Sequence, residues 1–138
     1  MKRADPGEAL AAHGLRITRQ RVLLLELLRR SKAHPTAIEL HRQILAKFPS
    51  TSRKTVYEAL SSLVNAGLAS CVTEGGEPFR YEANPTPHYH GRCRMCGHID
   101  DLPASADGPI RGLTAVPEGF HVEAVHVTLL GVCRRCRE

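Results

Sequence analysis

The sequence of 138 residues is poor in aromatic side chains and has no long apolar run. With no Trp, three Tyr and three Phe, its core has to be built from Leu, Val, Ile and Ala. No run approaches the roughly 20 apolar residues that a membrane-spanning helix needs. The opening residues MKRADPG also lack the apolar stretch of a secretory signal peptide. We therefore expect a cytoplasmic protein with no membrane partner.

Positive charge is concentrated in the first half of the chain. Residues 1–57 contain 12 Lys and Arg against 4 Asp and Glu, whereas residues 88–138 contain 6 of each kind. This asymmetry favours a module that binds a polyanion, joined to a module with another task. A basic face that is merely solvated has the same composition, so charge alone leaves nucleic-acid binding open.

Cysteine is scarce but grouped. Four of the five cysteines form two CxxC pairs, Cys93 with Cys96 and Cys133 with Cys136, and each pair follows a segment of extended character. Because thiols do not persist as structural disulfides in a reducing cytosol, we predict that the four thiolates hold one structural Zn²⁺. The alternative is a redox CxxC, which needs one pair only and usually opens a helix. Cys71 stands alone and is interpreted as a small apolar strand residue.

The first 83 residues have the pattern of a winged helix, which is a helix-turn-helix motif followed by a β-hairpin. Apolar residues recur at three- and four-residue spacing, and Thr18 is a good N-cap for the second helix. Gly75 and Gly76 are typical of a hairpin turn. The predicted helices are 6–13, 19–30, 36–47 and 53–66, and the predicted strands are 68–73 and 79–83. The expected buried face of the third helix is Ile38, Leu40, Ile44 and Leu45.

Residues 84–87 (NPTP) are the predicted hinge, because two prolines in four residues exclude a helix. For residues 88–138 we predict strands at 88–93, 98–102 and 120–132 and a helix near 105–114. About fifty residues are too few for a solid core, so this module needs a metal, a partner chain or both. The expected fold class is α+β: a winged-helix DNA-binding domain (1–83), the hinge (84–87) and a small α/β dimerisation and metal-binding domain (88–138).

The start of the fourth predicted helix carries side chains suited to DNA. In helix-turn-helix proteins this turn enters the major groove. Arg53 and Lys54 can bind phosphates or guanine edges, and Tyr57 can contact a thymine methyl group. A solvated surface position for each cation, and a place in the core for Tyr57, are the alternatives. The predicted DNA-binding residues are Arg16, Arg19, Ser52, Arg53, Lys54, Thr55 and Tyr57.

Histidines and carboxylates gather in the sequence around the hinge. His88 and His90 share one face of an extended segment, because side chains alternate with a period of two. Nitrogen and oxygen ligands without a thiolate favour Mn²⁺ or Fe²⁺ over a closed zinc site. Spacing alone explains these histidines equally well as surface strand residues. The candidate ligands are His34, Glu82, His88, His90, Asp100 and Asp101.

Nine short motifs carry a resemblance to a known family. In order and spacing they cover nearly the whole chain and resemble the ferric uptake regulator (Fur) superfamily of metal-dependent repressors. The motifs are GLRITRQR (14–21), HPTA (34–37), SRKTVY (52–57), NAGL (65–68), RYE (80–82), HYH (88–90), CRMCG (93–97), GF (119–120) and GVCRRC (131–136).

The resemblance implies a homodimer that binds an AT-rich inverted repeat of double-stranded DNA through its winged helices. It also implies a structural Zn²⁺ held by the four cysteines and a regulatory Fe²⁺ or Mn²⁺ at the hinge. Pro87, Tyr89 and Val125 stand where other members carry further ligands, so one regulatory site is expected. The regulatory ligands that the resemblance implies are His34, Glu82, His88, His90 and Asp101.

The His-Tyr-His element resembles the peroxide-sensing branch of this superfamily. That branch usually has Asp where this chain has Glu82, and Glu is more typical of metal-uptake regulators. A metal-uptake regulator without peroxide sensing is therefore one alternative. A non-haem metalloenzyme that uses the His and carboxylate cluster, and a zinc-stabilised interaction module without a regulatory metal, are two others. The basic winged helix and the lack of a substrate-pocket motif favour a repressor that is not an enzyme.

Overall fold

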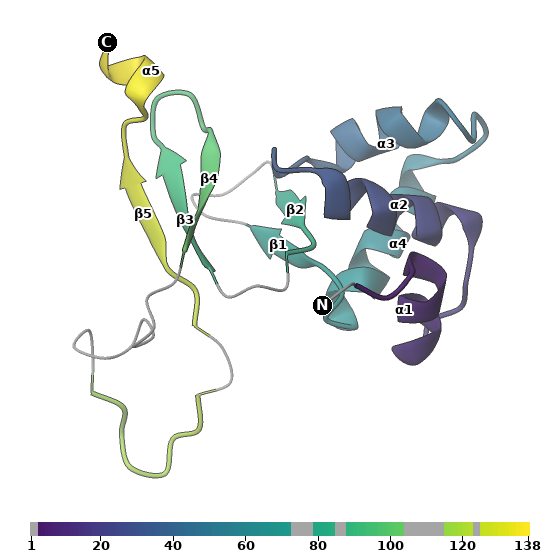
Figure 1. The fold of residues 1–138 in the computed structure, drawn as a ribbon, viewed down its shortest axis with the longest axis horizontal. Coiled ribbons are helices and arrows are strands. Elements are labelled where there is room, and N and C mark those ends of the chain that lie inside the picture. The colour runs from purple at the N-terminus through teal and green to yellow at the C-terminus, as the bar shows by residue number, and fades with distance from the viewer. Residues whose placement is uncertain (1–2, 73–78, 85–87, 104–114, 123–124) are drawn as a thin grey trace. The chain divides into compact units, whose positions relative to one another are not determined.

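The computed structural model describes residues 3–72, 79–84, 88–103, 115–122 and 125–138, which form an α+β fold as predicted. The chain divides into two compact units, Met1–Pro85 and Thr86–Glu138, and each is described by itself. Figure 1 shows helices α1 to α4 with strands β1 and β2 in the first unit, and strands β3 to β5 with helix α5 in the second. Within the described residues, no helix has the length and apolarity to span a bilayer.

The helices of the first unit begin at polar N-caps. The Thr18 hydroxyl accepts a hydrogen bond from the Arg21 amide, and Thr36 and Glu39 form a reciprocal capping box. Ser52 caps the last helix by accepting from the Thr55 amide. These caps satisfy amides that have no partner inside the helix. The helices are α1 (Pro6–Ala12), α2 (Arg19–Arg30), α3 (Ala37–Leu45) and α4 (Arg53–Asn65).

The core of the first unit is aliphatic, as expected from the scarcity of aromatic residues. Fully buried leucines from α1, α2, α3 and α4 pack together, which fixes these helices around one another. The prediction that Ile38 belongs to the buried face of α3 is wrong, because its side chain is 46% exposed. Ala37, Leu40 and Ile44 form that face instead, since their spacing of three and four residues follows the helical repeat.

A two-stranded antiparallel hairpin completes the first unit. Strand β1 (Ser70–Val72) pairs with β2 (Arg80–Glu82), and Cys71 lies opposite Tyr81. The predicted turn at Gly75 and Gly76 lies outside the described residues. Three core helices followed by this hairpin are the winged-helix arrangement that the sequence predicts.

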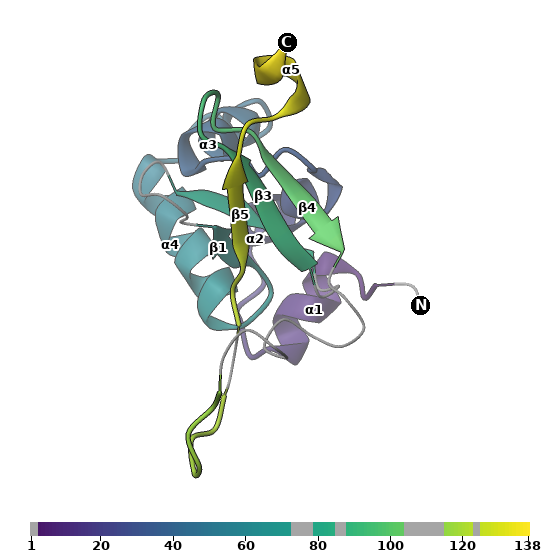
Figure 2. The ribbon, with the colours of Figure 1, turned by 90° about the vertical axis from the view of Figure 1, so that its left-hand side faces the viewer.

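The second unit is built on a three-stranded sheet in the order β4, β3, β5. Figure 2 shows β3 between the other two strands. Strand β3 (His88–Cys93) pairs antiparallel with β4 (Ile99–Pro103) and parallel with β5 (Thr128–Gly131). This register places Asp101 opposite His90 and Gly131 opposite Cys93. One end of β3 thus carries Cys93, and the two histidines lie toward its other end.

The predicted strand 120–132 is too long. Among the described residues of this range, Thr128–Gly131 forms the strand, because these four residues pair in register with β3. A turn marked by Gly119, with φ near +81°, and a hydrogen bond from the Phe120 amide to the Pro117 carbonyl precede it. The sequence also did not predict helix α5 (Arg134–Arg137). The predicted helix near 105–114 lies outside the described residues.

Candidate metal centres and nucleic-acid interface

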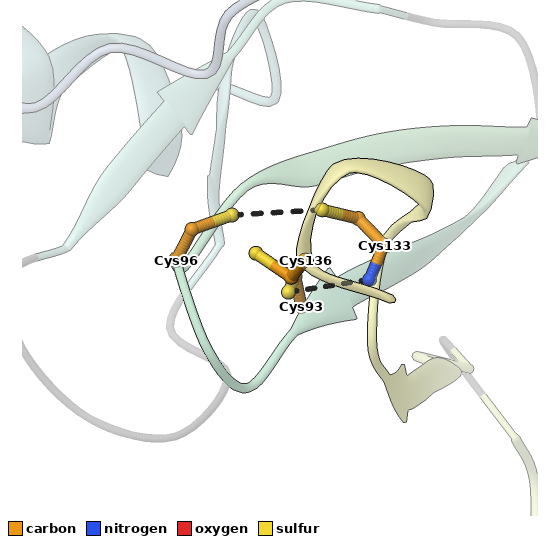
Figure 3. A group of neighbouring side chains, drawn as sticks. All are labelled: Cys93, Cys96, Cys133 and Cys136. Atoms are coloured by element: carbon orange, nitrogen blue, oxygen red, sulfur yellow. Dashed lines mark hydrogen bonds between the residues drawn. The ribbon is translucent and has the colours of Figure 1, made fainter. Parts of the chain in front are cut away.

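The four cysteines of the two CxxC pairs come together in the second unit. Their sulfur atoms all lie within 4.8 Å of one another, and Figure 3 shows the four side chains converging. Sγ of Cys96 lies 3.8 Å from Sγ of Cys133. Four convergent thiols suit the tetrahedral, all-sulfur ligand set of a structural Zn²⁺.

Local backbone structure brings the two pairs together. Cys93 ends β3, and the chain then turns through Gly97, whose φ of +77° favours glycine. The second pair opens α5, and its first residue, Cys133, is the N-cap of that helix. The parallel pairing of β3 with β5 aligns the two pairs, and the Arg94 amide donates to the Gly131 carbonyl at 2.8 Å.

Hydrogen bonds shift the pKa values of two of the four thiols in opposite directions. The backbone amide of Cys133, 3.3 Å from Sγ of Cys93, and that of Cys96 lower the pKa of the Cys93 thiol to about 6. Hydrogen bonding to the Cys133 thiol and then burial raise the pKa of Cys136 to about 12. The cluster therefore offers a thiolate at neutral pH before any metal arrives, which is the form that binds a metal.

A second candidate pair lies in the first unit. Nε2 of His34 is 3.1 Å from Oε2 of Glu82, and the two side chains are only 3% and 7% exposed. Ionisable groups at this depth are normally paired or bound to a metal, because an isolated buried charge is costly. The pair therefore combines nitrogen and oxygen donors in a protected position.

The chain around His34 is held in an uncommon conformation. Its φ of +51° lies in the left-handed region, which is rare for residues other than glycine. The Arg80 guanidinium donates to the His34 carbonyl at 3.0 Å, and the Tyr81 amide donates to the Pro35 carbonyl at 2.9 Å. Strand β2 thus fixes the turn before α3, and Arg80 has a role that the sequence pattern gave no means to assign.

A third group of candidate ligands lies on the sheet of the second unit. Nε2 of His88 and Nε2 of His90 are 3.2 Å apart, and their ring centroids are 4.8 Å apart. Oδ1 of Asp101 lies 3.6 Å from the first and 3.5 Å from the second of these nitrogens. The alternation of β3 and the register of β4 produce this cluster of two imidazoles and a carboxylate.

Asp100, which the sequence alone could not separate from Asp101, contacts a different residue. Its Oδ1 lies 2.9 Å from Nε2 of His98, and both side chains are largely exposed. Neighbouring residues of a strand point to opposite faces, so Asp100 and Asp101 cannot share one site.

The predicted DNA-binding residues of α4 are displayed at its first turn. Arg53, Lys54 and Tyr57 are exposed, and the Tyr57 side chain is 47% exposed rather than part of the core. Ser52 caps the helix by accepting from the Thr55 amide at 3.1 Å, and the hydroxyl groups of Ser52 and Thr55 also lie 2.9 Å apart. Lys54 and Glu58 form an exposed ion pair at 3.8 Å, one helical turn apart.

Two more predicted contacts precede or begin α2. Arg16 and Arg19 are both exposed, and neither is part of the core cluster. The Arg16 carbonyl accepts a hydrogen bond from the Arg21 guanidinium at 2.8 Å. The backbone of Arg16 is therefore held against α2, while the Arg16 side chain is exposed to solvent. These exposed cations give the winged helix the positive surface that phosphate binding requires.

Comparison with known proteins agrees with this combination of features. The model of the ferric uptake regulator family matches residues 12–130. The peroxide operon regulator of Bacillus subtilis is 36% identical over 129 residues, which are 94% of this chain and 89% of that protein. The crystal structure of the Campylobacter jejuni peroxide stress regulator is 27% identical with a TM-score of 0.71, over 94% of this chain and 97% of that one.

The structure of the ferric uptake regulator from Pseudomonas aeruginosa with manganese has the same fold. It is 23% identical with a TM-score of 0.76, and the match covers 95% of this chain and 99% of that one. The family model and the Bacillus relative each span most of the chain. The chain therefore belongs to the ferric uptake regulator family and is a metal-dependent transcriptional repressor rather than an enzyme.

Proposed function

We propose that this chain is a peroxide-responsive repressor that binds DNA when Fe²⁺ or Mn²⁺ is bound. Members of its family bind DNA as dimers. In our proposal, residues 1–83 bind an AT-rich inverted repeat, 84–87 form the hinge, and 88–138 dimerise. A structural Zn²⁺ on the four cysteines stabilises the dimerisation domain. In our proposal the repressor acts in the cytoplasm.

The regulatory metal in this proposal is bound by His34, Glu82, His88, His90 and Asp101. The observation that carries it is the buried contact between His34 and Glu82, because ligands from the DNA-binding unit would let a bound metal favour one arrangement of that unit directly. Five residues separate Glu82 from His88, so the chain keeps these two residues within roughly 20 Å. Three imidazoles and two carboxylates form a set without sulfur, which suits Fe²⁺ and Mn²⁺.

Peroxide sensing follows from the same ligand set. Fe²⁺ held by these residues would supply reducing chemistry toward hydrogen peroxide beside the ligand imidazoles, whereas Mn²⁺ would be far less prone to this reaction. Oxidation of His34 or His88 removes a metal ligand and weakens the metal-bound, DNA-binding form. The named relatives from Bacillus subtilis and Campylobacter jejuni are peroxide regulators, which supports this reading of the site.

Metal-uptake regulation without peroxide sensing is the second candidate function. Glu82 favours it, because a side chain one methylene longer than Asp can reach the metal in a different geometry and restrict peroxide access. Because Glu82 is buried, its carboxylate cannot turn toward solvent, and the length of its side chain sets where the carboxylate lies at the site. This alternative uses the same metals and the same DNA interface.

Operator binding tests the proposed function directly. Zinc-loaded protein is first used to select sequences from random DNA in the presence of Mn²⁺. Fluorescence anisotropy then measures binding of the selected duplex with and without Mn²⁺. We expect Mn²⁺ to strengthen binding by roughly 5- to 150-fold, the usual range of coupling between two sites. Equal binding with and without the metal would contradict a metal-dependent repressor.

A further inference from the structure

Arg21, near the start of α2, contacts Arg16, a residue of the proposed DNA interface, and Ser62, which lies further along α4. Its Nη1 donates to the carbonyl oxygen of Arg16 at 2.8 Å, and its Nη2 donates to Oγ of Ser62 at 3.3 Å. Oγ of Ser62 in turn donates to the carbonyl oxygen of Glu58 at 3.0 Å. One guanidinium group thus joins the segment before α2 to the helix α4.

This connection makes use of the geometry of arginine. A guanidinium presents several donors in a rigid fork, so it can hold two acceptors at a fixed spacing, whereas an ammonium is a single point. The Arg21 amide also donates to Oγ1 of Thr18 at 3.1 Å, which ties the same segment a second time. Arg21 is half-buried, while Arg16 and Arg19 are exposed. The donors of Arg21 are therefore directed at protein, and those of its neighbours at solvent.

We propose that Arg21 is a positioning residue for operator binding. It fixes the segment that carries Arg16 against α4, so that both meet DNA at a fixed spacing. The inference rests on the proposed function, in which Arg16 and the start of α4 bind DNA. Fixing the segment before binding reduces the conformational entropy that is lost when the complex forms.

A substitution that leaves the charge unchanged separates positioning from direct phosphate binding. Ser62→Ala removes the acceptor of Nη2, and alanine preserves the helical propensity of α4. We expect operator affinity to fall roughly two- to tenfold, the size of one net hydrogen bond. The salt dependence of binding should stay unchanged, because no cation is lost. Ser61→Ala, at the exposed neighbouring position, is the matched control and should bind like the wild type.

The second experiment is a double-mutant cycle between Arg21→Gln and Arg16→Ala. If Arg21 acts through Arg16, then Arg21→Gln should cost much less affinity once Arg16 is already absent. Arg30→Gln, which removes the same charge from the exposed end of α2, is the control and should not couple to Arg16→Ala. Additive losses, together with a salt slope reduced by about one in Arg21→Gln, would mean a direct phosphate contact and would overturn the proposal.

Hydrogen exchange of the free protein distinguishes this inference from the proposed function. Arg21→Gln should accelerate amide exchange in residues 15–18, whether or not DNA is added, because the segment loses its tie to α4. Unchanged exchange overturns the positioning role. If Arg16→Ala alone binds the operator like the wild type, the assignment of Arg16 fails, and the role of Arg21 in DNA binding falls with it. If no operator is bound at all, the proposed function fails and the role of Arg21 in DNA binding fails with it, whereas unchanged exchange beside normal operator binding overturns the positioning role alone.

Discussion

Nε2 of His34 lies 3.1 Å from Oε2 of Glu82, with both side chains buried in the winged-helix unit. Removing one partner from a buried ionisable pair leaves the other in an apolar environment, which costs several kcal/mol unless the group changes its protonation state. Glu82 is the last residue of β2, directly before the hinge. A metal bound to this pair would therefore restrain the chain where it leaves the DNA-binding unit.

Substitution of His90 tests whether the ligands of the second unit take part in metal regulation. His90→Ala should retain zinc and remain dimeric, because the residue is not part of the cysteine cluster. It should lose the Mn²⁺-dependent gain in operator binding, since one imidazole ligand is missing. Anisotropy with labelled operator DNA measures this gain.

The matched control is His121→Ala, which removes an exposed histidine from the same unit. This control should respond to Mn²⁺ like the wild type. An undiminished response in His90→Ala would contradict the proposed ligand set, whereas equal losses in both variants would indicate a general effect of removing an imidazole.

The cysteine cluster should stabilise the second unit through zinc. Cys96→Ser exchanges a thiol for a hydroxyl at an exposed position, so little packing is lost, but the four-sulfur ligand set is broken. We expect zinc release, loss of the dimer and a fall of several kcal/mol in unfolding free energy, because binding energy in such sites is also folding energy. Elemental analysis, sedimentation and thermal denaturation measure these three effects. A variant that stays dimeric and equally stable would disprove a structural role.

The sequence predicts those parts of the fold that depend on neighbouring residues better than those that depend on pairing between distant segments. Caps and helical periodicity are local, so Thr18 marks the start of α2 correctly and α4 begins at Arg53 as predicted. Ile38 was misassigned because an apolar residue beside a helical stripe looks the same in sequence as one within it. The predicted strand 120–132 is longer than β5, because the length of β5 is set by its pairing with β3, which is a non-local property.

The candidate sites show the same division. The CxxC spacing predicts a four-cysteine cluster without knowledge of the fold, because each pair is close in sequence. The contact between Arg80 and His34 joins residues far apart in sequence, and no local pattern announces it. Likewise, spacing alone left Asp100 and Asp101 open, the family resemblance favoured Asp101, and the pairing register places Asp101 opposite His90.

Arg53 tests the DNA interface while leaving both candidate metal sites unchanged. Arg53→Ala should weaken operator binding by about 1–3 kcal/mol if the side chain makes a bidentate base contact. If it binds only phosphate, affinity should fall evenly across DNA sequences, and the salt slope should drop by about one. Arg42→Ala, an exposed arginine on α3, is the control. Affinity equal to that of the wild type would show that the first turn of α4 is not in the groove.

Cys71 should be chemically quiet despite its thiol. Burial is the main cause that raises its pKa, while a hydrogen bond with Tyr81 acts in the opposite direction. A raised pKa means a smaller thiolate fraction at neutral pH, so alkylation should be slower than for an unfolded cysteine and should increase at a higher pH. Mass spectrometry after timed alkylation measures this rate. Cys71→Ser should keep zinc, dimerisation and operator binding, and rapid alkylation at pH 7 would contradict the assignment.

Peroxide should act on ligand histidines rather than on cysteines. Protein loaded with Fe²⁺ is treated with mild hydrogen peroxide and digested, and its peptides are weighed. We expect one added oxygen on the peptide that holds His34 or on the one that holds His88, together with loss of operator binding. The Mn²⁺ form should show neither change, and Cys71→Ser should respond like the wild type. Glu82→Asp is the informative variant, because a shorter carboxylate should open the metal to peroxide and speed the oxidation. Unmodified histidines and unchanged DNA binding in the Fe²⁺ form would instead identify a metal-uptake regulator.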